Sequence, residues 1–446
     1  MHSPKMLLAT LIAPIVALRP RTLGREIIAG AITPPILGGV VAAGIAGASE
    51  PEGRVLSLVP MRLQEAMRES RIAWIMYSQF EYVAAGLAVA ALAPKGEARA
   101  LLRRQRAGPD YKDVHCGPLG SLADIYLPDN QADGAAFDEM LIFVPGGAWS
   151  HGYKSFYTLT SRRLANEFEC AVAVVGYDLY PVADGAAQVA QVEEAVSWAE
   201  EGAPLAKGCV RKLLNEGAKL AVVGHSAGGQ LSAAALLGRS GGSSGEKVAS
   251  VGSLALLSAP FELRRHVCHE ARRGVATVSA LSAAFAGDDG ATYSAGDEAA
   301  LSEAALSSAR AGASSPDNAA PSAMRRPRYF DDTQPMALLS PECAVKADVA
   351  AALTKLPPRV ALFHGMDDPV VPVSSSERFE AALKARGDGD DDSAAHAEGG
   401  AGSAARPTVV SEYRDKCSHL DYVLELITVA DRTPPIVDFL RRVVFQ

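Results

Sequence analysis

The sequence predicts an α/β fold in which a mostly parallel sheet carries helices on both faces, preceded by a hydrophobic helical N-terminal region. Three observations support this prediction. From about residue 108, short apolar stretches rich in β-branched residues alternate with helical patterns, which is typical of a parallel sheet. Hydrophobic residues make up 48% of the 446 residues and charged residues 21%, so a large core can form. Residues 1–107 contain long apolar runs.

The expected elements follow one another along a domain spanning residues 108–446. The expected strands are 123–127, 140–144, 171–177, 220–223, 253–258, 360–363 and 409–413. Helical patterns occur at 156–168, 186–200, 227–237, 375–384 and 435–444. In such a sheet the functional loops lie at the carboxyl ends of the strands.

Two stretches of this domain do not fit the alternation. Residues 287–324 are rich in Ala, Ser, Gly and Asp, and residues 386–406 contain three consecutive Asp and a Gly-rich run. Segments with so few bulky apolar residues cannot bury a core. We interpret both as low-complexity insertions without a catalytic role.

Two runs within residues 1–107 are long enough to span a bilayer. Residues 27–49 form an uncharged run of 23, and residues 73–94 a run of 22 interrupted only by Glu81. Basic residues precede the first run and follow the second, which indicates a membrane hairpin with both outer ends in the cytosol. The alternatives are a helix at 73–94 packed on the globular domain, and a cleaved targeting peptide in the acid-free residues 1–25.

The charge distribution and the cysteine content argue against two functional classes, nucleic-acid binders and zinc fingers. Residues 1–110 carry 13 Lys and Arg against 8 Asp and Glu, although the whole chain has a net charge of −8. A basic, apolar end joined to an acidic remainder indicates a membrane-facing end, and the acidic remainder argues against a general nucleic-acid binder. The six cysteines form no Cys-x-x-Cys pair, so we expect buried thiols in a reducing compartment rather than a zinc finger.

The sequence Gly-His-Ser-Ala-Gly at residues 224–228 predicts a nucleophile elbow. It follows an expected strand and precedes an expected helix, which is the context this motif requires. Close packing at the turn leaves room only for hydrogen at the two glycines. We expect Ser226 to be exposed above the sheet, with the Ala227 N–H at the helix start facing a developing oxyanion.

A second glycine-rich turn, Pro-Gly-Gly-Ala-Trp at residues 145–149, follows the strand 140–144. It lies about 80 residues before the nucleophile, where an oxyanion-hole loop is expected. Its backbone can approach a substrate closely, and Gly147 and Ala148 are the favoured donors. The predicted oxyanion hole consists of Gly146, Gly147, Ala148 and Ala227.

A serine nucleophile needs a base and an orienting acid, which follow it in the order Asp, His in this type of sheet. The loop after strand 360–363 contains Asp368, our choice for the acid, with Asp367 as the alternative. His419 follows strand 409–413 and precedes a helix, so it is the candidate base.

Four other histidines lie in or near the expected site or beside an acidic residue. We interpret His225, inside the elbow, and His364, before a Gly turn, as structural residues. His266 and His269 lie one helical turn apart beside Glu270, but they lack the His-Glu-x-x-His spacing and a third ligand. We therefore predict no metal site and no cofactor.

With these residues in place, the chain resembles the α/β-hydrolase superfamily and, within it, the isoprenylcysteine carboxyl methylesterases. The most specific motif is Gly-Gly-Ala-Trp followed by Gly-Tyr-Lys within residues 144–154. Further similar segments are 124–128, 224–228, 261–274, 339–342, 356–372 and the segment around His419. Where that family has Asp-Tyr-Arg after its third strand, this chain has Gly-Tyr-Asp at residues 176–178, which changes the charge on the substrate side.

The resemblance implies a membrane-associated serine carboxylesterase that hydrolyses the methyl ester of prenylated cysteine through Ser226, His419 and Asp368. The alternatives are a generic carboxylesterase or lipase, an arylformamidase-like hydrolase, or an inactive membrane scaffold. We expect a small-molecule or lipidated-cysteine ester as substrate and no nucleic-acid partner. The expected location is the membrane of the endoplasmic reticulum or Golgi, with the catalytic domain in the cytosol.

Overall fold

A computed structural model describes most of residues 103–445. The described ranges are 103–105, 107–131, 134–205, 212–239, 247–272, 279–285, 335–385, 406–428 and 433–445. The predicted membrane helices 27–49 and 73–94 and the predicted insertion at 287–324 lie outside them, as does all but the last residue of the predicted insertion at 386–406. Within these ranges no helix has the length and apolar character needed to cross a membrane. The chain divides into two compact units, residues 1–103 with 270–279, and residues 104–269 with 280–446, and the second contains the sheet.

The sheet has eight strands in the order β1-β2-β4-β3-β5-β6-β7-β8. Strand β2 pairs antiparallel with both β1 and β4, and all other pairs are parallel, which confirms the mostly parallel sheet. The strands are β1 (Tyr111–His115), β2 (Leu122–Tyr126), β3 (Phe137–Val144), β4 (Ala171–Gly176), β5 (Leu214–His225), β6 (Ala249–Leu257), β7 (Arg359–Gly365) and β8 (Thr408–Arg414).

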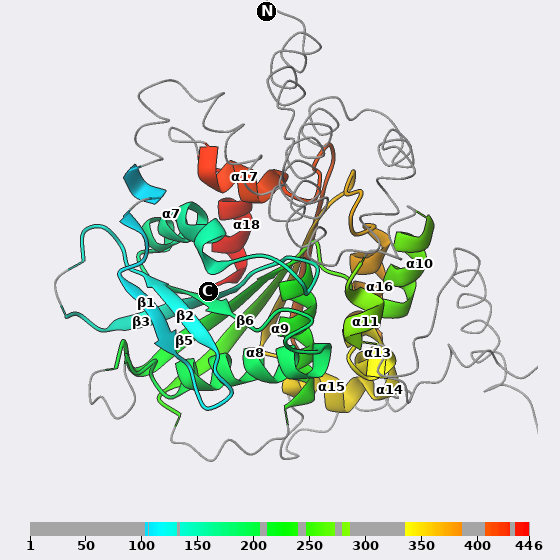
Figure 1. The fold of residues 1–446 in the computed structure, drawn as a ribbon, viewed down its shortest axis with the longest axis horizontal. Coiled ribbons are helices and arrows are strands. Elements are labelled where there is room, and N and C mark those ends of the chain that lie inside the picture. The colour runs from blue at the N-terminus through cyan, green and yellow to red at the C-terminus, as the bar shows by residue number, and fades with distance from the viewer. Residues whose placement is uncertain are drawn as a thin grey trace, which may run out of the picture. The chain divides into compact units, whose positions relative to one another are not determined.

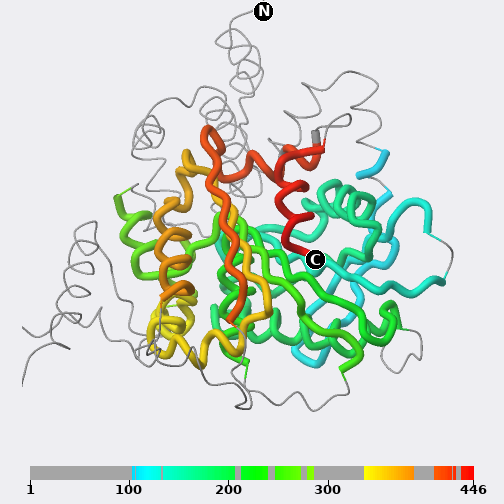
Figure 2. Tube along the Cα trace, turned by 180° about the vertical axis from the view of Figure 1, so that it is seen from behind, coloured from blue at the N-terminus to red at the C-terminus, as the bar shows by residue number. Residues whose placement is uncertain are grey.

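Helices cover both faces of this sheet (Figures 1 and 2). Successive residues of β3 belong to different cores: Met140 and Ile142 to one, Leu141 and Phe143 to the other. This period of two explains why the strands are apolar throughout. The first core is covered by α8 (Gly185–Glu200), α9 (Ala227–Gly238), α11 (Leu281–Phe285), α14 (Pro341–Ala347), α15 (Val349–Lys355) and α16 (Ser374–Lys384), and the second by α7 (Thr158–Phe168), α17 (Asp421–Thr428) and α18 (Pro435–Val443).

All seven expected strands and the five expected helices are present, with shifted ends. The sequence did not predict β1, an edge strand with three of its five residues exposed and hence no apolar run. Short helices were also missed, since a few residues give no periodic signal. These are η1 (Lys154–Tyr157), α11, α13 (Pro335–Leu338), α14 and α15. The ten-residue α10 (Leu263–Arg272) was not among the expected helices either.

The topology brings the predicted site to one edge of the sheet. Strands β3, β5, β7 and β8 run parallel, so the loops after them emerge at a common carboxyl edge. Those loops contain Gly147, Ser226, Asp368 and His419, respectively. Residues separated by up to 272 positions in the sequence can therefore meet.

Candidate active site

Ser226 stands alone between β5 and α9, in a strained turn. Its φ of 54° and ψ of −123° are rare for a residue with a side chain. A Cβ at Gly224 would lie 2.6 Å from the carbonyl oxygen of Gly228, and a Cβ at Gly228 would lie 2.2 Å from the carbonyl oxygen of Val144. Only glycine fits at either position, so the sharp strand–turn–helix arrangement depends on both.

Ser226 is less accessible than the sequence predicted, with only 8% of its surface exposed. Gly146 packs against it so closely that a Cβ there would lie 2.9 Å from the Ser226 Cβ. On another side, His419 Nε2 lies 3.0 Å from Ser226 Oγ. The nucleophile candidate is thus enclosed by the loop after β3 and by the candidate base.

The structure brings Ser226, His419 and Asp368 into one hydrogen-bonded chain. His419 Nδ1 lies 2.7 Å from Asp368 Oδ2, and its Nε2 faces the serine hydroxyl. A carboxylate oxygen only accepts, so Nδ1 carries the proton and Nε2 is left to accept from Ser226 Oγ–H. The alternative acid, Asp367, is exposed, whereas Asp368 is buried and faces His419.

The environment of Asp368 keeps its carboxylate ionised. Oδ1 accepts hydrogen bonds from the backbone N–H groups of Val370 and Val371, both at 2.9 Å. Burial alone would raise the pKa of Asp368, but the charge of His419 and the hydrogen bonds from His364 and His419 outweigh it and hold the pKa well below its usual range. The acid can therefore act as a fixed negative charge next to the base.

The glycine-rich loop after β3 has an unusual backbone. Gly147 has φ +148°, and a Cβ there would lie 1.8 Å from the carbonyl oxygen of His151. Ala148 and Trp149 both have positive φ, at 44° and 61°. The buried Trp149 holds this shape, since its Nε1–H donates to Gln230 Oε1 on α9 at 2.9 Å. The loop is thereby attached to the helix that begins at the nucleophile.

Three backbone N–H groups remain available for an oxyanion. Within the part of the chain that the structure describes, no group accepts a hydrogen bond from the N–H of Gly147, Ala148 or Ala227. Gly146 has to be corrected, because its N–H donates to the hydroxyl of Tyr157 at 3.2 Å. The candidate oxyanion hole therefore consists of Gly147, Ala148 and Ala227.

Tyr157 and His225 form a buried polar pair that sequence reasoning did not identify as part of the site. The Tyr157 hydroxyl oxygen lies 3.3 Å from His225 Nδ1, and it also accepts a hydrogen bond from the Gly146 N–H. Burial, followed by the charge of His419, lowers the pKa of His225 to about 3. His225 is neutral at physiological pH and supports the site without acting as its base.

The lysine of the Gly-Tyr-Lys motif serves the scaffold rather than the reacting groups. Lys154 Nζ lies 2.7 Å from Asp113 Oδ1 and 2.9 Å from Asp124 Oδ1. Asp124 is buried in β2, so the ion pair attaches the end of the oxyanion loop to the antiparallel edge of the sheet.

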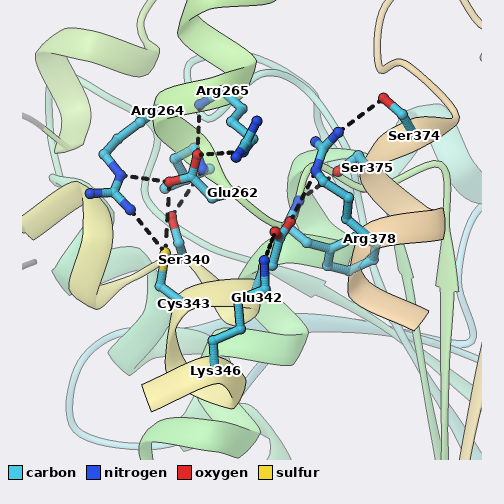
Figure 3. Close-up of polar contacts among 12 residues, drawn as sticks. Glu262, Arg264, Arg265, Ser340, Glu342, Cys343, Lys346, Ser374, Ser375 and Arg378 are labelled. Atoms are coloured by element: carbon cyan, nitrogen blue, oxygen red, sulfur yellow. Dashed lines mark hydrogen bonds and ion pairs between the residues drawn. The ribbon is translucent and has the colours of Figure 1, made fainter. Parts of the chain in front are cut away.

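The segment Leu-Ser-Pro-Glu at residues 339–342 also acts structurally (Figure 3). Ser340 Oγ accepts from the Leu263 N–H at 2.9 Å, and the buried Glu342 binds Lys346 at 2.7 Å and Arg378 at 3.4 Å. These contacts join the starts of α10 and α14 to α16, the helix that follows the acid loop.

His266 and His269, the pair beside Glu270, contact groups other than a metal ligand set. His269 Nε2 lies 3.1 Å from the carbonyl oxygen of Pro369, and its ring stacks near that of His266 with centroids 6.1 Å apart. Among the described residues, no three His, Cys, Asp or Glu side chains are grouped so that they could hold a metal ion.

The chain is similar to several known proteins. Residues 141–321 match a family model described as the alpha/beta hydrolase fold. A probable isoprenylcysteine alpha-carbonyl methylesterase from Oryza sativa subsp. japonica is 27% identical over 270 residues, which cover 59% of this chain and 50% of that protein. An isoprenylcysteine alpha-carbonyl methylesterase from Arabidopsis thaliana is 25% identical over 269 residues, with the same coverage. The chain spans about half the length of these curated relatives.

Solved structures include a hyperthermophilic esterase from the archaeon Pyrobaculum calidifontis, with 18% identity and a TM-score of 0.45 over 80% of this chain and 88% of that one. The named relatives confirm the resemblance predicted from the Gly-Gly-Ala-Trp and Gly-Tyr-Lys motifs. With its strand order and the matching family model, the chain has the α/β-hydrolase fold, and its sequence is similar to those of named isoprenylcysteine methylesterases.

Proposed function

We propose that the protein is a serine ester hydrolase whose substrate is the methyl ester of a prenylated cysteine. The hydrolase activity rests on one observation, the hydrogen-bonded chain from Ser226 through His419 to Asp368 beside available backbone N–H groups. The substrate class is supported by the names of the relatives in Oryza sativa and Arabidopsis thaliana.

The first half of the reaction forms an acyl-enzyme. Ser226 Oγ attacks the ester carbonyl carbon while its proton passes over the 3.0 Å contact to His419 Nε2. The new positive charge on the imidazole is stabilised by the buried carboxylate of Asp368. The negative charge on the former carbonyl oxygen is stabilised by the N–H groups of Gly147, Ala148 and Ala227, the last at the positive end of α9.

The second half releases the products. His419 donates its proton from Nε2 to the departing methoxide oxygen, so methanol leaves and the acyl group stays on Ser226. A water molecule then gives a proton to His419 Nε2 and attacks the acyl carbon. When the Ser226 ester bond breaks, Oγ takes the proton back from His419 Nε2, and the carboxylic acid leaves and releases its remaining proton to solvent.

Labelling with a fluorophosphonate probe tests this proposal directly. The wild-type protein should be labelled and Ser226→Ala should not, because the probe reacts only with an activated serine. Turnover of a prenylcysteine methyl ester, a short p-nitrophenyl ester and an aryl formamide then identifies the substrate class. An unlabelled wild-type protein that is folded by circular dichroism would reject the hydrolase in favour of an inactive scaffold.

We propose further that residues 1–95 hold the hydrolase domain at a membrane. The support is in the sequence, where the apolar runs 27–49 and 73–94 have basic residues outside both. Each CH₂ of a prenyl chain buried in lipid is worth about 0.8 kcal/mol, so the substrate resides in the bilayer.

Deleting residues 1–95 should therefore release the protein from membranes and lower turnover of a bilayer-embedded prenyl ester much more than turnover of a soluble ester. The quantity to measure is the ratio of the two activities, full length against truncated, at equal amounts of folded protein. If the ratio is unchanged, the membrane role is wrong.

Tyr157→Phe should lower kcat about tenfold with little change in KM. It removes the acceptor for the buried Gly146 N–H, which costs about 1–3 kcal/mol, and it releases the loop that presents the oxyanion donors. The measurement is steady-state hydrolysis of a soluble ester.

Tyr126→Phe provides a matched control for this substitution. Tyr126 is also fully buried, and its hydroxyl forms a 3.0 Å hydrogen bond with Thr158 on the scaffold. Its loss should lower the melting temperature without changing kcat per folded molecule. Equal losses of kcat in the two variants would contradict a specific role for Tyr157.

A further inference from the structure

His364 lies in β7, four residues before the candidate acid, and is completely buried. Its Nε2 is 2.9 Å from the carbonyl oxygen of Val371 and 3.3 Å from Asp368 Oδ2. Its Nδ1 is 2.7 Å from Ser376 Oγ on α16. Both ring nitrogens therefore face polar partners, and Asp368 Oδ2 is shared between His364 and His419.

These partners fix the proton on the His364 ring. The carbonyl oxygen of Val371 and the carboxylate of Asp368 only accept, so Nε2 must carry a proton that lies between them. The hydroxyl of Ser376 can donate to Nδ1, so the ring satisfies all these contacts as a neutral imidazole. The resulting hydrogen-bonded series runs from Ser376 through His364 and Asp368 to His419.

The same contacts close the turn that contains the acid. Val371 donates its N–H to Asp368 Oδ1, while its carbonyl oxygen accepts from His364. His364 thus holds both the carboxylate and the peptide group that binds the other carboxylate oxygen. Without it, two backbone N–H groups would fix Oδ1, but the direction of Oδ2 would depend on His419 alone.

Ser376, the first residue of this series, lies at the start of a helix that is held by several hydrogen bonds. Ser375, the neighbour of Ser376, accepts the Phe261 N–H at 3.0 Å and donates to the Ala259 carbonyl oxygen at 3.2 Å. One turn later, Arg378 reaches Glu342 (Figure 3). The start of α16 is therefore attached to the segment after β6 and to the first turn of α14, so Ser376 Oγ is presented at a fixed position.

We propose that His364 is a positioning residue for the reaction proposed above, which aligns Asp368 Oδ2 with His419 Nδ1. The expected effect on turnover rests on the proposed function. The alignment of the Asp368 carboxylate rests only on the contacts described above. His364 has no contact with Ser226 among those found in the described residues, so it acts through the acid. The other titratable groups facing Asp368 are His419 and Cys417, from the loop after β8, and His225 at the end of β5.

Three substitutions separate the two sides of the ring. His364→Gln keeps an amide N–H near the position of Nε2 and so preserves the contacts with Asp368 and Val371. His364→Asn can replace only the Nδ1 contact with Ser376. His364→Leu removes the contacts of both ring nitrogens. Ser376→Ala is a milder variant that leaves the histidine in place, should the changes at His364 impair folding.

Val360→Ala serves as the stability control. Val360 is fully buried at the start of the same strand, eight residues before Asp368. Its truncation leaves a cavity and lowers stability without changing the hydrogen bonds of the acid. All rates are expressed per folded molecule, from circular dichroism and thermal melts.

Two readouts distinguish positioning from a structural role. In the Asn and Leu variants kcat for a soluble ester should fall about ten- to a hundredfold while KM stays near the wild-type value, because misalignment affects the proton transfer and not substrate binding. The proton shared by His419 Nδ1 and Asp368 Oδ2, which resonates far downfield in the NMR spectrum, should shift or disappear. The Gln variant and Val360→Ala should retain both properties, and Ser376→Ala should show a smaller loss of kcat.

The outcomes separate this inference from the proposed function. A wild-type protein that hydrolyses no ester would reject the proposed function, and the downfield proton would still decide the role of His364. An active wild type with an unchanged downfield proton and unchanged kcat in His364→Leu would overturn the inference alone. Equal losses in the Leu and Gln variants would also overturn it, because the Nε2–H contact would then not matter.

Discussion

Ser226→Ala is expected to abolish ester hydrolysis and leave the fold intact. Loss of the nucleophile should lower the rate by about 10⁴–10⁶, because acyl transfer to the enzyme no longer occurs. The folded state loses one hydrogen bond to His419, worth about 0.5–1.5 kcal/mol, which a domain of this size tolerates. Turnover of a short soluble ester and a thermal melt measure the two effects.

Ser258→Ala is a suitable control for this substitution. Ser258 directly follows β6, the strand next to the nucleophile strand, and it shares both burial and a positive φ, at 46°, with Ser226. It has no contact with His419 among those found in the described residues, so its hydroxyl should be dispensable for turnover. Activity of Ser226→Ala above about a tenth of wild type would reject this serine as the nucleophile.

Asp368→Asn is expected to lower the rate by about 10²–10⁴ through the wrong tautomer of His419. Val370 and Val371 direct two N–H groups at Oδ1, so the single carbonyl oxygen of the new amide will occupy that position. The amide NH₂ then faces His419 Nδ1, which must accept, and the ring proton moves to Nε2. A protonated Nε2 cannot take the proton of Ser226.

Asp367→Asn is the matched control, one residue away on the same loop. Its side chain is exposed, and its backbone N–H donates to the Cys417 carbonyl oxygen, a contact that the substitution leaves unchanged. Its activity should therefore be close to wild type. If this variant is inactive and Asp368→Asn is active, the acid has been assigned to the wrong neighbour.

Much of this arrangement could be predicted from the sequence because its signals are local. The central strands are buried on both faces, so each is a short apolar run, and the elbow needs two glycines around one serine. Ser226 and His419 could then be predicted as nucleophile and base because each lies in a loop that follows an expected strand. The edge strand β1 has no such run, since only Val114 of its five residues is buried.

The remaining features depend on contacts between segments far apart in the sequence. Gly146 looked like an oxyanion donor until the fold placed the Tyr157 hydroxyl against its N–H. His364 looked like an ordinary core histidine, and only the turn back to Asp368 and Val371 shows what it holds. The sequence favoured Asp368 over Asp367, and the fold shows that Asp368 is the buried one and faces His419.

The amino edge of the sheet offers a site for protein engineering. Helix α16 ends beside the start of β8, where Arg406 donates to the Ala385 carbonyl oxygen at 3.2 Å and Thr408 donates to that of Pro358 at 2.8 Å. The serine, base and acid all follow the opposite ends of their strands. A reporter domain with closely spaced termini, such as a fluorescent protein, could therefore be inserted between residues 385 and 406 to follow the enzyme in living cells, with its turnover preserved.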